Sequence, residues 1–205
     1  MVRFLLFLVV AASCLLQYAG SRALALLSVS RQNRAGLIWV GLSALGVALF
    51  PGSLVVTDFF VLSVALFGGM LLSRLVGSVG ALLIMLGVAA VVDLISTHAG
   101  PTRWIADGIA GHPGGLAALR FLAVCIRLRG MILAVIGAGD LMFFTDCVSV
   151  TRRSGWPERA ALAVPLLGLL CALGVGLFAG LTPAIPFLAA AVGLYACASS
   201  AWKRR

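Results

Sequence analysis

Residues 76–97 read VGSVGALLIMLGVAAVVDLIST, an apolar run in which Asp93 is the only ionisable side chain. About 20 apolar residues are enough for a helix to cross the hydrocarbon core of a bilayer. The run therefore predicts a transmembrane helix. Its single acid is a candidate functional group, because an ionisable side chain at membrane depth is costly.

Six further apolar runs lie on either side of this segment, at residues 4–20, 36–50, 54–73, 130–150, 160–179 and 183–201. We therefore predict an all-α fold, a polytopic membrane helix bundle of about seven transmembrane helices. Only Pro51-Gly52 separates the second run from the third, so a shallow hairpin is an alternative for these two. The first run is also compatible with a signal peptide, although no clean small-residue cleavage site follows it.

The composition favours the same class of protein. Of the 205 residues, 62% are hydrophobic and 10% are charged, and the mean hydropathy is +1.17. The net charge of +9 comes from cations that lie between the apolar runs, which is typical of membrane loops and not of a nucleic-acid-binding face. We expect a multi-pass integral membrane protein of the cell membrane, with the lipid bilayer as its surroundings and no nucleic-acid partner.

The sequence does not suggest a cofactor, a metal site or a disulfide framework. The five cysteines are odd in number and have no CxxC spacing, so we interpret them as small apolar side chains. His98 and His112 have no acid or cysteine at ligand spacing. The GxG at 137–139 lies inside an apolar run, which excludes a dinucleotide-binding fingerprint.

We divide the chain into two unequal parts, and a long connection at 98–129 lies within the second part. We predict three N-terminal spans in residues 1–75, and a second part with four spans in residues 76–205. Within the connection, residues 116–128 are apolar except for Arg120 and Arg127, which predicts an interfacial amphipathic helix. The alternative is that this segment simply extends the next span.

The distribution of cations predicts an orientation. With seven spans, one side receives Arg3, Arg103, Arg120, Arg127 and Arg129. The other side receives Arg22, Arg31, Arg34, Arg74, Arg152, Arg153, Arg159, Lys203, Arg204 and Arg205. We therefore expect the C-terminus inside, and the N-terminus and the long loop outside.

Three acids fall at membrane depth by position: Asp58, Asp93 and Asp140. Asp58 is close to the start of its span, where it can reach the headgroups. Asp146 lies near Arg152 and Arg153, so we interpret it as an interfacial group.

Asp93 and Asp140 lie on consecutive spans that flank the long loop, and both are shallow from the same side. About five residues separate Asp93 from the loop, and about ten separate Asp140 from it. Asp140 closes the segment Gly137-Ala138-Gly139-Asp140, whose glycines permit a close approach of a helix or an extended peptide. Pro183-Ala184-Ile185-Pro186 opens the last span on the same side, although prolines are also common in the first turn of any helix.

An aspartate in one span, GxGD in the next, one intervening span and then a proline motif resembles the presenilin and signal peptide peptidase family of intramembrane aspartyl proteases. The resemblance covers residues 76–195. It implies that Asp93 and Asp140 are the catalytic pair, and that Gly137 and Gly139 belong to the GxGD motif. It also implies that Pro183, Ala184 and Ile185, with Pro186, form a PAL-like segment that helps to hold the substrate.

The chain departs from the family pattern at two positions. Val92 stands before the first aspartate, where tyrosine is common, and Ile185 stands where leucine is usual. The prepilin peptidases also use GxGD, but a lysine usually follows two residues after the aspartate, where this chain has Met142. A prepilin-peptidase-like aspartyl protease remains an alternative.

The resemblance implies an aspartic endopeptidase that hydrolyses peptide bonds in transmembrane or signal-peptide helices. Presenilin and signal peptide peptidase lie in opposite orientations in the membrane, and the cation count favours that of signal peptide peptidase. Two adjacent carboxyl groups share one proton, so one acts as base and the other as acid. Two other classes remain open. A proton- or cation-coupled transporter would use Asp58, Asp93 and Asp140 as relays, but no internal repeat supports it. A scaffold protein would pack through the GxxxG at 176–180.

Overall fold

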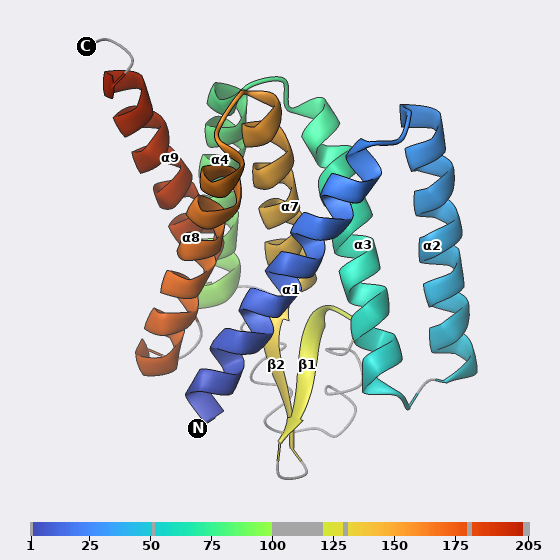
Figure 1. Cartoon of the computed structure of the whole chain (residues 1–205). Helices are drawn as coiled ribbons and strands as arrows, with labels where there is room; N and C mark the ends of the chain where they lie inside the picture. The colour runs from blue at the N-terminus through green and yellow to red at the C-terminus, as the bar shows by residue number, and fades with distance from the viewer. Residues whose placement is uncertain (1, 51, 100–120, 129–130, 180–181, 203–205) are drawn as a thin grey trace.

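The computed structural model describes residues 2–50, 52–99, 121–128, 131–179 and 182–202. Within these ranges it contains seven helices and one two-stranded antiparallel hairpin. The helices run side by side, and the hairpin lies at the end of the bundle that holds the N-terminus (Figure 1). The elements are α1 (Val2–Ala25), α2 (Val29–Leu49), α3 (Leu54–Leu75), α4 (Val79–Ala99), β1 (Ala123–Leu128), β2 (Met131–Gly137), α7 (Ala138–Arg153), α8 (Glu158–Ala179) and α9 (Ile185–Trp202).

The predicted helical bundle is confirmed as a fold class, and six of the seven apolar runs are helices close to their expected positions. Four of the helices, α1, α3, α4 and α8, are long and apolar enough to cross a membrane, and α9 is a shorter apolar helix. Helix α2 begins with a polar turn and α7 has only 16 residues. Four candidate spans are therefore established, and the count of seven stays a prediction.

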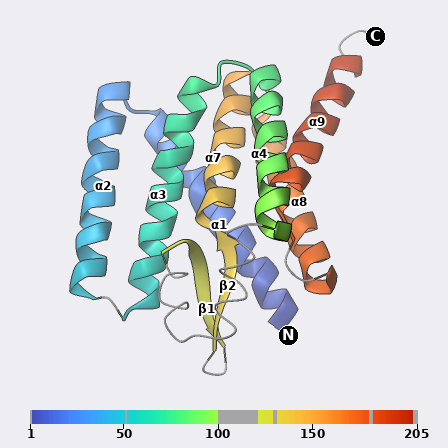
Figure 2. The ribbon, with the colours of Figure 1, turned by 180° about the vertical axis from the view of Figure 1, so that it is seen from behind.

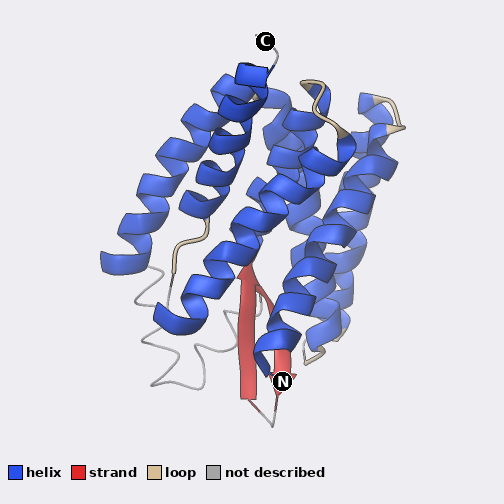
Figure 3. Cartoon of the chain, turned by 60° about the vertical axis from the view of Figure 1, so that its left-hand side comes forward, coloured by secondary structure: helices blue, strands red, loops and turns tan. Residues whose placement is uncertain are grey.

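The predictions for the segment before Asp140 were wrong in two places. The expected span at 130–150 is instead strand β2 followed by α7, and the expected amphipathic helix at 116–128 contains strand β1 from Ala123 onward. Residues 100–120, which include Arg120 and His112, lie outside the described residues. The hairpin also means that the fold is not purely helical (Figure 3).

Helix α7 lies at the centre of the bundle and contacts α1, α3, α4, α8 and α9 (Figures 1 and 2). Its Leu141, Phe144, Cys147 and Val148 are fully buried. The outer faces of the surrounding helices are apolar instead, and they include Leu37 and Ile84 at 77% and 72% exposure. Such an exposed apolar surface is compatible with contact with lipid.

The interior contains polar side chains that bond within the protein. Gln17, 2% exposed, donates from Nε2 to the carbonyl oxygen of Leu62 at 2.8 Å and accepts from the hydroxyl of Thr145 at 3.1 Å. These bonds join α1, α3 and α7. A buried polar group is stable only with such partners, so Gln17 fixes the relative position of the three helices.

Two glycines allow the closest helix contacts. A Cβ added at Gly69 would collide with the carbonyl oxygen of Met142 and lie 2.6 Å from Cβ of Thr145 on α7. A Cβ added at Gly168 would lie 2.9 Å from the backbone of Leu188 on α9. The approach of α3 to α7, and of α8 to α9, therefore requires the absence of a side chain at these positions.

Candidate active site

The GxGD segment forms the junction between strand β2 and helix α7. Gly137 is extended, with φ −70° and ψ 149°, and precedes the first residue of the helix. Its N–H donates to Oδ2 of Asp140 at 3.2 Å. Asp140 therefore lies in the first turn of α7, not ten residues inside a span. The free N–H groups of a first helical turn suit a carboxylate at this position.

The two glycines of the motif have different surroundings. A Cβ at Gly137 would lie 3.0 Å from Oδ2 of Asp140, so a side chain here would crowd the carboxylate. A Cβ at Gly139 would meet no described atom within 4 Å. No described side chain or backbone therefore packs against Gly139.

Asp93 lies near the end of α4 and is bonded to the proline segment. Its Oδ2 accepts the N–H of Ile185 at 3.1 Å, and its Oδ1 accepts the hydroxyl of Thr97 at 3.5 Å. Ile185 is the first residue of α9, and Pro186 follows it in the first turn, where a helix does not need the missing N–H. The start of α9 is thus attached to Asp93 through the backbone.

A cavity of about 410 Å³ is lined by both acids. Gly137, Pro183 and Ala184 also line it, and Asp93 lies within electrostatic reach of Asp140. Apolar side chains of α1 and α8 form much of the remaining wall, among them Leu6, Val10, Leu169 and Leu173. The structure thus brings together five of the eight residues that the sequence predicted for the site.

The other three predicted residues lie around this cavity rather than in its lining. Gly139 and Pro186 line neither this cavity nor the one next to it. Ile185 lines a second cavity of about 560 Å³, together with Asp93, Phe143 and side chains of α4 such as Val92. Val92 is 61% exposed, so this second cavity opens on the outer face of the bundle. Asp93 lies between the two cavities.

The hairpin links the site to α3. Val135, Ile136 and Gly137 of β2 line the 410 Å³ cavity. Strand β1 packs against α3, where Oδ1 of Asp58 accepts the N–H of Cys125 at 2.8 Å. One strand is therefore attached to the bundle, and the other borders the acids.

Asp58 has a role that the sequence did not suggest. We expected its carboxylate to extend to the headgroups, but it binds the backbone of β1 instead. Cys125 lies at an irregularity of the ladder, between the pairs Val124–Ile136 and Cys125–Ala134. No local sequence pattern indicates this bond, because the two residues are 67 positions apart.

Asp146 also differs from its prediction. It is fully buried, and neither carboxylate oxygen has a hydrogen-bond partner among the described residues. The charge of Arg153, seven residues later on α7, acts on it. Asp146 is thus an interior group and not an interfacial one.

Within the described ranges, no three His, Cys, Asp or Glu side chains are grouped so that they hold a metal ion. Comparison of the chain with protein-family models, with curated proteins and with solved structures finds no match.

Proposed function

We propose that this protein is an intramembrane aspartyl protease of the presenilin and signal peptide peptidase type. The observation that carries the proposal is the cavity that Asp93 and Asp140 line together with Pro183, next to strand β2. Acid–base hydrolysis of a peptide bond without a metal requires two carboxyl groups, one as base and one as acid, and this apolar cavity holds such a pair.

The two acids divide the work of hydrolysis. One carboxylate takes a proton from a water molecule as the water oxygen attacks the scissile carbonyl carbon. The protonated partner donates a hydrogen bond to the carbonyl oxygen and stabilises the tetrahedral intermediate. The C–N bond then breaks as the leaving nitrogen receives a proton. Either carboxyl group can take either role, so the roles belong to the pair and not to either residue.

Strand β2 offers backbone hydrogen-bond partners to a helical substrate that has been unwound. A transmembrane helix hides its carbonyl groups in its own hydrogen bonds, so cleavage requires local unwinding and new backbone partners. The hairpin has two strands in the described part of the chain, and β1 is held by Asp58 of α3. The outer edge of β2 is then the natural partner for an unwound substrate segment.

The proline segment supports the same step from the other side. Pro183 and Pro186 lack N–H groups, and the N–H of Ile185 is bonded to Asp93. The segment next to the cavity therefore offers few competing donors. It positions the first acid and leaves room for the substrate along β2.

The proposal places the helices across a bilayer. Four of them are long and apolar enough, and α2, α7 and α9 would complete the seven spans. Arg22, Arg74, Arg152 and Arg153 lie near the end of the bundle opposite the hairpin, so the positive-inside rule favours that end for the cytoplasm. The site would then face the other side of a cell membrane, and substrates would be transmembrane or signal-peptide helices.

The test measures the hydrolysis of a synthetic peptide by the protein reconstituted in lipid nanodiscs. The peptide has a single transmembrane span, and glycines weaken the centre of its helix. Asp93→Asn and Asp140→Asn should each lower turnover by about a thousandfold or more, because each removes one partner of the acid–base pair. Mass spectrometry of the fragments gives the cleavage position.

Glu158→Gln is the matched control, since it removes a carboxylate at the opposite end of the bundle, where Glu158 pairs with Arg22 and Arg152. Its turnover should equal that of the unaltered protein. Turnover that survives Asp140→Asn would show that another group performs the chemistry.

A proton- or cation-coupled carrier is the second candidate, because Asp93 lines cavities on both of its sides. It predicts ion-dependent flux in vesicles that Asp93→Asn abolishes, with no peptide fragments. The prepilin-peptidase alternative has less support. A Cβ at Gly68 of α3 would lie 2.9 Å from Sδ of Met142, so the position of the usual lysine packs against another helix.

A further inference from the structure

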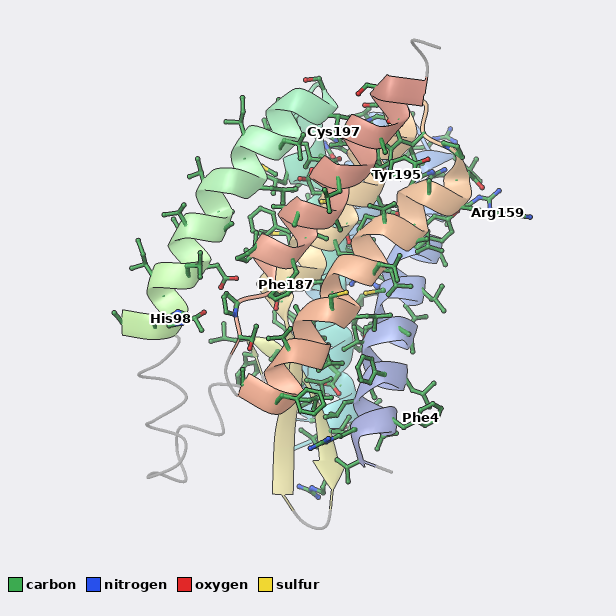
Figure 4. All side chains as sticks on the ribbon, turned by 90° about the vertical axis from the view of Figure 1, so that its left-hand side faces the viewer. Phe4, His98, Arg159, Phe187, Tyr195 and Cys197 are labelled. Carbon is green, nitrogen blue, oxygen red and sulfur yellow. The ribbon has the colours of Figure 1, made fainter. Side chains whose placement is uncertain are left out.

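A cavity of about 470 Å³ lies at the end of the bundle opposite the acids. Helices α1, α3 and α7 end around it, and α2 and α8 begin there. Arg74, Arg152 and Arg153 line it, and among the described residues of its lining Glu158 is the only acid. Arg159 lies at this end too, far from Phe4 and His98 (Figure 4).

The positive charge of this cavity is only partly balanced. Glu158 is shared between Arg152 at 3.5 Å and Arg22 at 3.4 Å. Arg153 donates to the carbonyl oxygen of Ser73, and the buried Asp146 lies within electrostatic reach of it. The described residues therefore leave an excess of positive charge around the cavity.

Arg74 has the least compensation. Its guanidinium donates to the side-chain oxygens of Asn33 and of Gln32, the latter at 2.6 Å, and both of these groups are neutral. It forms no ion pair within the described part of the chain. A guanidinium has five donors in a planar fork, so Arg74 still has donors for an anion such as phosphate.

A second, apolar cavity of about 440 Å³ continues from this one. It lies between α2 and α3, and Gln32, Met70 and Arg74 line both cavities. Leu37, Val40 and Phe67 form much of its wall. A charged cavity that continues into an apolar cleft matches a molecule with an anionic head and a hydrocarbon chain.

We propose that these two cavities bind one anionic glycerophospholipid, with its phosphate at Arg74, Arg152 and Arg153 and an acyl chain between α2 and α3. Trp156, which also lines the charged cavity, has the amphipathic ring typical of the headgroup level. Anionic lipids are abundant in the cytoplasmic leaflet, and basic pockets between helices bind their headgroups. The proposal rests on the membrane placement of the bundle and not on protease activity.

The lipid would attach α2 to the bundle. Helix α2 packs mainly on α3, and its polar contacts to that helix are the bonds from Arg74 to Gln32 and Asn33. An acyl chain in the cleft adds apolar contact along both helices. Bound lipid should therefore stabilise the folded protein, as any ligand does that binds only the native state.

The test compares the full-length protein in phosphatidylcholine nanodiscs with and without phosphatidylglycerol. Phosphatidylglycerol should raise the melting temperature by about 4 °C, and native mass spectrometry should show one retained molecule per chain. Arg74→Gln should weaken this binding about fivefold to tenfold, because one phosphate-binding cation is lost. Arg34→Gln is the matched control: Arg34 belongs to the same end of α2 but lines neither cavity. An equal loss in Arg34→Gln would mean diffuse surface charge and would overturn the site.

Val40→Phe tests the acyl chain separately and keeps every arginine. It should weaken phosphatidylglycerol binding and leave the protein folded, because the larger ring occupies the apolar cleft and not the helix interior. If inorganic phosphate stabilises the protein as strongly as phosphatidylglycerol does, the ligand is a free anion and the lipid proposal is wrong. Failure of phosphatidylglycerol to stabilise the unaltered protein would overturn it as well.

Discussion

The two ends of the helix bundle use charged side chains in opposite ways. At the hairpin end, each of three acids accepts a backbone N–H: Asp58 from Cys125, Asp93 from Ile185 and Asp140 from Gly137. At the other end, arginines donate to side-chain oxygens and to a carbonyl group. Carboxylates thus hold irregular backbone in place within the apolar bundle, and guanidinium groups lie where the helices end.

This difference has a physical basis. A strand, a bend and an unwound helix start have N–H groups without helical partners, and such groups cannot remain unpaired in hydrocarbon. A nearby carboxylate satisfies them and remains available for chemistry. No described residue of the basic end belongs to a strand, and in the proposed membrane placement the helices there end where water and headgroups would supply the partners.

Gly69 sets the distance between α3 and α7, two helices that both run along the bundle toward the basic end (Figure 1). Gly69→Ala should lower the free energy of unfolding by about 2–3 kcal/mol, because the new methyl group collides with the backbone of α7. Thermal unfolding in nanodiscs measures the loss. Gly41→Ala is the control, because a Cβ at Gly41 meets no described atom within 4 Å. Equal stability of the two variants would show that α3 and α7 are not in this close contact.

Asp58→Ala should affect only the hairpin end of the bundle, which holds the three acids. We expect turnover to fall about 30-fold, because β1 loses its attachment and β2 no longer holds the substrate at the correct distance from the acids. Hydrogen exchange at the amide of Cys125 should become faster at the same time. Asp58→Asn keeps an acceptor oxygen and should retain most of the activity. Unchanged exchange in Asp58→Ala would argue against the bond between Asp58 and Cys125.

The sequence predicted six of the seven helices well, because each of the six lies in a long apolar run. It failed at 123–137, where apolar residues suit a strand and a span equally. The signal was present: the β-branched runs AVCIRL and MILAVIG are separated only by Arg129-Gly130, which is typical of a hairpin. The high hydrophobicity of the segment favours a span as strongly as the turn residues favour a hairpin.

The candidate site was predicted in part, for a similar reason. Asp93, Asp140 and the proline segment were identified because acids and prolines are rare in apolar runs. The bonds from Asp58 to Cys125 and from Ile185 to Asp93 were not predicted, since each joins residues far apart in the sequence. Such contacts depend on how the helices pack, which the local pattern does not determine.

Pro183→Ala combined with Pro186→Ala should lower turnover about tenfold without unfolding the protein. Both substitutions restore an N–H group, and the new donors compete for the carbonyl groups and carboxylates around the cavity. Size-exclusion chromatography and thermal unfolding should match the unaltered protein. The control is Pro165→Ala in the middle of α8, a proline that does not line the cavity. Full turnover in the double variant would remove the proline segment from the mechanism.

Gly139→Ala should have the smallest effect on turnover, and it tests stability and substrate binding separately. The added methyl group meets no described atom within 4 Å, and alanine is preferred over glycine in a helix by about 1 kcal/mol. Stability should therefore rise slightly. If an unwound substrate occupies the open space beside Gly139, the same methyl group should raise KM about threefold and leave kcat nearly unchanged, because it reduces binding and not the chemistry. An unchanged KM would mean that the substrate approaches the acids from elsewhere, and the outer cavity next to Asp93 would then become the more plausible path.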